Sequence, residues 1–117
     1  MPKYALLLNH PPERYRDLSE DDMMAIIKDY VAWVEDMSAK GCYHGGQKLA
    51  DKAGLTLSKN NDDFELHDSP YTELAEVLGG FMLIEADNLD AAIELCKSHP
   101  HFVHNTAMEI RLIDSED

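Results

Sequence analysis

The chain alternates between short, compact apolar runs and longer segments whose apolar residues recur every three or four positions. The runs KYALLLN at residues 3–9 and GGFMLIEA at residues 79–86 are short and continuous, which predicts two buried strands. A third strand is predicted at residues 42–50, where the glycine pair of CYHGGQKLA indicates a bulge or a close approach to the backbone. Apolar and polar residues roughly alternate in AMEIRLID, residues 107–114, which predicts a fourth strand.

Residues 19–40 carry the spacing of an amphipathic helix. Ser19 can cap the first turn, and the three acidic residues that follow it suit the positive end of the helix dipole. Gly41 follows the last apolar residue and is a natural helix stop. One apolar stripe is formed by Met23, Ile26, Ile27, Tyr30, Trp33, Val34 and Met37.

A hairpin and a shorter helix are predicted in the second half of the chain. LTLSK and FELHD flank the turn residues NNDD, so residues 55–68 read as a hairpin. SPYTELAEVL, residues 69–78, predicts a turn that leads into one or two helical turns. In DNLDAAIELCKSHP, Asp87 or Asn88 begins a second helix, and Pro100 is expected to end it.

The order of these elements is β-α-β, a hairpin insert, then β-α-β, in a single domain over residues 1–117. Right-handed crossovers place both helices on one face of one sheet, which is the ferredoxin-like α+β arrangement. The other sheet face then needs cover. We expect a second subunit to pack on it face to face, which forms a dimeric α/β barrel and makes the protein a homodimer.

Charge and composition narrow the classes of partner. With 23 acidic and 10 basic residues, the 117-residue chain has a formal charge of −13, which disfavours binding to nucleic acid or to an anionic membrane surface. No run approaches the roughly 20 apolar residues that span a bilayer. The first residues do not resemble a signal peptide, and two cysteines are too few for a disulfide framework. We therefore expect a cytoplasmic protein.

Three of the six histidines lie in SHPHFVHN, residues 98–105. Pro100 separates His99 from His101, and the spacing lacks the four Cys/His ligands of a structural zinc site, so we expect no metal here. His99 and His101 are interpreted as solvated loop histidines. His104 lies closer to the last predicted strand and is a candidate general acid or base if a carboxylate such as Asp68 or Glu109 pairs with it.

Other polar motifs have simpler readings. Asp68 precedes a small residue and a proline, so its carboxylate can instead accept hydrogen bonds from the backbone of its own turn. The two Gly-Gly pairs match neither phosphate-binding loop pattern, and no flavin, haem or nicotinamide signature is present, so we expect no cofactor.

Several blocks together resemble a known family. KYALLL, GGQKLA, the long block DSPYTELAEVLGGFMLIEADNLDAAIELC and the final MEIRLI are similar to the DGPF-domain branch of the YCII-related proteins, over about residues 3–113. The resemblance implies the same ferredoxin-like, dimeric α/β-barrel fold and a small protein of mostly unknown activity. A dechlorinating branch of that family carries a histidine in its first helix; residues 19–40 contain none, so that activity is not carried over.

The resemblance also suggests site residues. Asp68 and Tyr71 stand where the branch has the Asp and Phe of Asp-Gly-Pro-Phe, and His104 resembles a histidine found shortly before the last strand. The leading hypothesis is an acid/base enzyme for a small organic molecule, with His104 as proton carrier and Asp68 as the group that orients it. Gln47, Tyr71 and Arg111 would contact the substrate. The alternative is a non-catalytic ligand-binding or regulatory homodimer that uses the same pocket.

Overall fold

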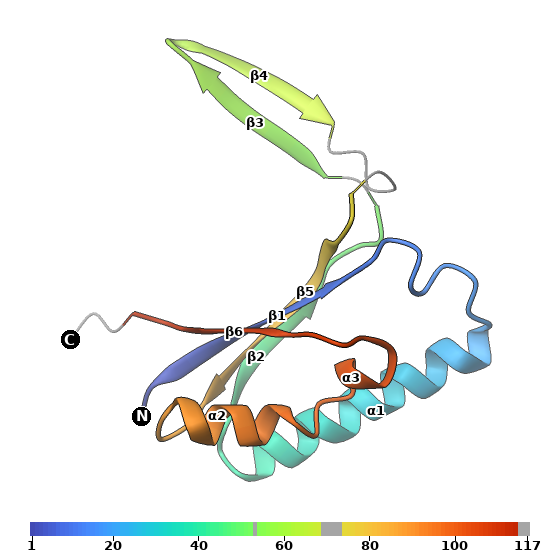
Figure 1. Ribbon diagram of the computed structural model, residues 1–117, viewed down its shortest axis with the longest axis vertical. Coiled ribbons are helices and arrows are strands. Elements are labelled where there is room, and N and C mark those ends of the chain that lie inside the picture. Colours follow the sequence, from blue (N-terminus) through green and yellow to red (C-terminus); the bar gives the residue numbers. More distant parts are fainter. Residues whose placement is uncertain (53, 69–73, 115–117) are drawn as a thin grey trace.

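A computed structural model of the chain describes residues 1–52, 54–68 and 74–114 as a mixed α+β domain (Figure 1). The predicted strands, the hairpin and both predicted helices are confirmed. In chain order the elements are β1 (Lys3–His10), α1 (Glu20–Ala39), β2 (Tyr43–Lys48), β3 (Leu55–Asn60), β4 (Asp63–Asp68), β5 (Val77–Glu85), α2 (Leu89–Cys96), α3 (His101–His104) and β6 (Glu109–Leu112).

The main sheet has four antiparallel strands in the order β2-β5-β1-β6. Its two central strands, β1 and β5, come from the two halves of the chain, and Tyr4 in β1 lies opposite Ile84 in β5 and Leu112 in β6. This order, with the helices between the strands in sequence, is compatible with a ferredoxin-like fold. Closure into a barrel with a second subunit stays a prediction.

Side chains of β1 alternate between the two faces of the sheet, as the pleat of a strand requires. Tyr4, Leu6 and Leu8 are buried on one face, where they join residues of both long helices. The buried members of this core from the helices are Trp33 and Met37 of α1 and Ala92 and Cys96 of α2. Both helices therefore cover the same sheet face, as predicted.

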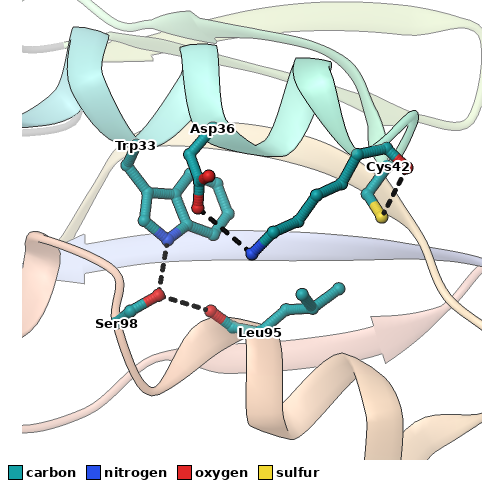
Figure 2. Close-up of polar contacts among 6 residues, drawn as sticks. Trp33, Asp36, Cys42, Leu95 and Ser98 are labelled. Carbon is teal, nitrogen blue, oxygen red and sulfur yellow. Dashed lines mark hydrogen bonds and ion pairs between the residues drawn. The ribbon is translucent and has the colours of Figure 1, made fainter.

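A polar joint links the two helices near the end of α2 (Figure 2). The indole Nε1–H of Trp33 donates to Ser98 Oγ over 3.0 Å, and Ser98 Oγ donates in turn to the carbonyl of Leu95 over 3.1 Å. This chain satisfies the one polar group of a 6 % exposed tryptophan, so the ring can pack in the core without a desolvated N–H.

The ends of the helices follow local signals. Ser19 accepts a hydrogen bond from the backbone N–H of Asp22 over 3.1 Å, and Gly41 adopts a φ of +73° just after the end of α1. Asn88, one of the two candidates, caps α2. The prediction for Pro100 was wrong: α2 already ends at Cys96, and Pro100 instead precedes α3, because its φ of −65° suits the entry to a helix.

The hairpin β3–β4 projects from the sheet (Figure 1). Four apolar side chains lie on one of its faces and are 62–67 % exposed: Leu55, Leu57, Phe64 and Leu66. The predicted helical turn after it falls largely on residues 69–73, outside the described residues, and residues 74–76 are not helical. None of the helices in the described ranges is long and apolar enough to cross a membrane.

Candidate functional site

A cavity of about 370 Å³ lies between the first half of α1 and the sheet. This volume is at the lower end of the range for small-molecule sites. The apolar stripe of α1 divides into two parts: Trp33 and Met37 fill the core, whereas the residues nearer its start line the cavity. The lining from α1 consists of Met23, Ile26, Ile27, Tyr30 and Val31, and the sheet contributes Leu8, His10, Tyr43, Phe81 and Met82 together with three glycines.

The three glycines, Gly46, Gly79 and Gly80, leave the sheet without side chains beneath the start of α1. Gly46 pairs with Met82, and Gly80 pairs with Leu8. A Cβ on Gly46 would lie 2.5 Å from the carbonyl oxygen of Phe81, and one on Gly80 would lie 2.8 Å from that of Gln47. Larger residues therefore do not fit, and the space above these positions stays open. One glycine of each pair, Gly46 and Gly80, thus marks a close approach of backbone, as the sequence indicated for the first pair.

His10, the last residue of β1, presents a hydrogen-bond acceptor to this cavity. The residue is 5 % exposed and lines the cavity, and its Nδ1 lies 2.7 Å from the carbonyl oxygen of Pro11. Because a carbonyl only accepts, Nδ1 must carry the hydrogen, and Nε2 of the neutral ring then holds a lone pair. Among the described residues Nε2 has no hydrogen-bond partner, and the ring lies directly over Gly79.

Tyr15 lies against His10 at the edge of the cavity, with ring centroids 4.9 Å apart and an interplanar angle of 73°. Its hydroxyl oxygen accepts a hydrogen bond from Asn105 Nδ2 over 2.7 Å. The Asn105 side chain also donates to the carbonyl of His101 over 3.2 Å, while its own Oδ1 is buried without a partner in the described part of the chain. Because the Tyr15 hydroxyl oxygen accepts from Asn105, the hydroxyl hydrogen remains available to donate to a ligand.

His99 and His101 are buried, with 2 % and 1 % of their surfaces exposed, so the prediction that they are solvated loop histidines was wrong. Burial lowers the pKa of His99 to about 4, and the charge of His101 adds to this effect. Burial also lowers the pKa of His101. His101 Nε2 donates to the carbonyl of Ala107 over 2.9 Å, and its backbone N–H donates to His99 Nδ1 over 2.9 Å. The segment around Pro100 has the sequence pattern of a loop, but the chain folds back through α3 and buries both rings.

His104 and Asp68 lie in different parts of the molecule. His104 is the last residue of α3 and is partly buried, with its ring centroid 6.0 Å from that of Tyr15. Asp68 is exposed and is the last residue of β4, at the base of the projecting hairpin, where it pairs with Leu55, the first residue of β3 (Figure 1). Neither residue is among those that line the cavity. Their proposed partnership as base and orienting carboxylate stays a prediction.

The predicted substrate-binding residues are also spread over the structure. Gln47 in β2 lines the cavity. Arg111 in β6 pairs with Ala5, whose neighbours in β1 face the helices, so the Arg111 side chain lies on the opposite sheet face. It is 70 % exposed there, and its Nε lies 3.9 Å from a carboxylate oxygen of Glu109. Tyr71 lies outside the described residues.

Charged groups near the cavity are already paired. Lys48 Nζ lies 3.1 Å from Asp51 Oδ2 and donates to the carbonyl of Leu49 over 3.0 Å. His44 in β2 contacts Glu85 Oε2 over 2.8 Å, and this hydrogen bond lowers the pKa of Glu85. In the part of the chain that the structure describes, no three His, Cys, Asp or Glu side chains are grouped so that they could hold a metal ion.

Fold and cavity together define a small α+β domain with a half-open, mainly apolar site of ligand size. The chain belongs to the YCII-related domain family, whose sequence profile matches residues 3–115. No curated protein sequence matches it significantly. The family assignment agrees with the resemblance seen in the sequence, whereas membership of the DGPF branch stays a prediction.

Sequence reasoning missed His10 and Tyr15 as cavity residues. His10 stands between a buried strand and two prolines, in NHPPERY, which reads only as a strand end. The useful signal was the two-residue period of a strand. Every second residue of β1 faces the helices, and position 10 belongs to that series. A histidine in a series otherwise made of Tyr4, Leu6 and Leu8 is a polar group aimed into the interior.

Proposed function

We propose that this protein is a small acid/base enzyme that acts on a small organic molecule held between α1 and the sheet, with His10 as the proton carrier. The observation that supports this proposal is the open Nε2 of His10 beside an apolar cavity, since a general base needs a free lone pair within reach of its substrate. Histidine is the side chain best suited to exchange protons near neutral pH. His10 takes the role that the resemblance assigned to His104, because His10 lines the cavity.

The proposed reaction is one that His10 and Tyr15 could catalyse without a cofactor, such as removal of a proton from a carbon next to a carbonyl. His10 Nε2 would take the proton, and the hydroxyl of Tyr15 would donate a hydrogen bond to the oxygen on which negative charge develops. Apolar side chains of α1 line one side of the cavity, and a bound ligand would displace water from between them and the sheet, which would strengthen both interactions. The same histidine would return the proton, so the simplest outcome is isomerisation.

Deuterium exchange tests proton transfer without knowledge of the natural substrate. Phenylacetone, a neutral aryl ketone, would be incubated in D₂O with the protein, and loss of its α-proton signal would be followed by NMR. We expect exchange faster than in buffer with the wild type and with His104→Ala, and the buffer rate with His10→Gln, because an amide cannot accept a proton. Loss of exchange in His104→Ala but not in His10→Gln would instead identify His104 as the base.

A second candidate function, ligand binding without catalysis, is favoured by the second nitrogen of His10. That nitrogen donates to a neutral backbone carbonyl, Pro11 O, and no carboxylate of the described residues contacts the ring. A carboxylate partner would stabilise the imidazolium that proton transfer creates, and a carbonyl does so less strongly. Saturable binding of small molecules together with exchange at the buffer rate for every compound would support a ligand-binding or regulatory role.

We also propose that the protein is a cytoplasmic homodimer of the DGPF branch. Support for the dimer comes from the sheet face away from the helices, where Ala5 pairs with Leu83 and Leu7 lies on the same side of β1. Sedimentation velocity would give about 26 kDa, twice the chain mass of 13.2 kDa, and Leu83→Lys would shift the species toward the monomer. A wild type that sediments at the monomer mass over the micromolar range would refute the dimer. The free thiols of Cys42 and Cys96 suit a reducing compartment.

A further inference from the structure

The acceptor at His10 constrains what a ligand must carry. His10 Nδ1 is committed to the carbonyl of Pro11, which leaves Nε2 of the neutral ring as an acceptor without a donor in the described residues. His10 lines the cavity, and Nε2 is not among the fully buried side-chain atoms that lack a partner in the described residues, so its partner must come from the cavity. A ligand that donates a hydrogen bond would satisfy this acceptor. A ligand that can only accept would not.

The hydroxyl of Tyr15 adds a second requirement. Its oxygen accepts from Asn105 Nδ2 over 2.7 Å, so its own hydrogen is the part left for a ligand. The Tyr15 and His10 rings are in edge contact, with centroids 4.9 Å apart, and both residues line the cavity. A hydroxyl group both donates and accepts, and it therefore matches these two groups better than an ether, which only accepts, or an ammonium group, which only donates.

Charge at the cavity disfavours anions. Lys48, a cation in the lining, is paired with Asp51 at 3.1 Å. His101 also lines the cavity, and burial lowers its pKa, so it remains neutral near pH 7. A carboxylate ligand would lose its hydration without gaining an unpaired cation, and the chain's formal charge of −13 repels it further.

The walls define the body of the ligand. Ile26, Ile27 and Val31 from α1 and Leu8 and Met82 from the sheet line the middle of the cavity, above the glycines. A volume of about 370 Å³ is sufficient for a small organic molecule that carries an aromatic ring.

From these observations we infer that the cavity binds small neutral alcohols or phenols, whose hydroxyl group donates a hydrogen bond to His10 Nε2. This ligand class rests on the cavity and the histidine of the proposed function, but it concerns binding and does not require proton transfer.

A double-mutant cycle between ligand and protein tests the hydrogen bond. Phenol and anisole differ in the hydrogen on oxygen, and His10→Phe keeps a ring while it removes the acceptor. Binding would be measured by ligand-observed NMR at about pH 8, where free histidine is neutral and phenol is still protonated. We expect His10→Phe to weaken phenol about 5- to 10-fold, the worth of one hydrogen bond, and to change anisole by less than about 2-fold. Equal effects on both ligands would overturn the inference.

Two further comparisons distinguish a wrong ligand class from a wrong catalytic role of His10. Benzoate has a similar ring but carries a charge, and we expect it to bind the wild type at least about 10-fold more weakly than phenol; equal or tighter binding of benzoate would overturn the inference. His10→Gln keeps an acceptor at the position of Nε2, so it should retain phenol binding while it abolishes proton exchange. If exchange is absent but the phenol effect is present, the enzyme proposal fails and the ligand class stands.

A second variant replaces His10→Phe if that protein does not fold. If circular dichroism shows that His10→Phe does not fold, Gly79→Ala replaces it, since a Cβ on Gly79 would collide with the imidazole ring and must push it aside. Displacement of the ring should weaken phenol about 5-fold or more relative to anisole. Unchanged selectivity for phenol in a folded Gly79→Ala would count against His10 as the acceptor.

Discussion

Acidification should destabilise the fold through His99. The ring is 2 % exposed and lies against Trp33, with ring centroids 4.4 Å apart. Its Nδ1 accepts the backbone N–H of His101 over 2.9 Å, so the folded state requires a neutral ring with its hydrogen on Nε2, which lies 3.3 Å from Met82 Sδ. A second proton would have to enter at Nδ1 and would break the bond to His101. The variant His99→Asn keeps an acceptor for that N–H and removes the titrating group.

The size of the effect follows from the two pKa values of His99. In the unfolded chain the ring takes up a proton near its ordinary value of 6.5, whereas the folded protein does so only at about 4. Between these values the unfolded state binds one more proton than the folded state, so stability falls as the pH falls. The loss is about 1.4 kcal/mol per pH unit and reaches about 2.5 kcal/mol at pH 4.5. Above pH 6.5 both states are neutral at this site, and His99 adds no pH dependence.

Urea denaturation followed by tryptophan fluorescence measures this difference, because Trp33 is the single tryptophan and contacts the ring directly. Wild type and His99→Asn would be compared at fixed protein concentration between about pH 7.5 and pH 4.5, so that other titrating groups cancel. The variant should be the less stable protein at the higher pH, since it lacks the ring that packs on Trp33. Its disadvantage should shrink by about 2.5 kcal/mol at the lower pH. A gap in unfolding free energy that stays constant across the range would refute the reasoning.

Two further pairs of variants test the hydrogen bond between the two helices and the close backbone contact at a glycine of the sheet. Trp33→Phe loses the hydrogen bond to Ser98 and part of a buried ring, so it should lower the unfolding free energy by about 2 kcal/mol. Ser98→Ala loses only the hydrogen bond and should lower it by about 1 kcal/mol. If wild type and both variants were equally stable in urea, the hydrogen bond between the helices would not stabilise the fold. Gly80→Ala forces a Cβ to within 2.8 Å of a backbone oxygen, so it should lower the free energy of thermal unfolding by about 1–3 kcal/mol. The control is Gly54→Ala, which should change stability little, because a Cβ there meets nothing within 4 Å. Similar melting temperatures for the two alanine variants would exclude the proposed backbone contact.

Local signals in the chain predicted most elements of the fold. Ser19 and Gly41 mark the two ends of α1, because a side-chain cap and a positive φ depend only on neighbouring residues. The compact run of β1 and the turn between β3 and β4 are equally local. The alternation of strands and helices was sufficient to predict a mixed α+β domain with both helices on one sheet face.

The candidate site depended on contacts between distant parts of the chain. Gly46 and Gly80 come together only because β2 and β5 are neighbours, and their missing side chains create the cavity beneath α1. His101 was misread because burial depends on what packs over a segment, and Pro100 gives no information on that. His10 became a candidate only when the sheet register placed its ring over Gly79 and the carbonyl of Pro11 fixed its tautomer. Sequence by itself determined the elements and their order, because these depend on short-range propensity and periodicity. Tertiary structure decided which polar groups share an enclosed space, because that depends on pairing across more than sixty residues of chain, as between Tyr15 and Asn105, which are 90 residues apart.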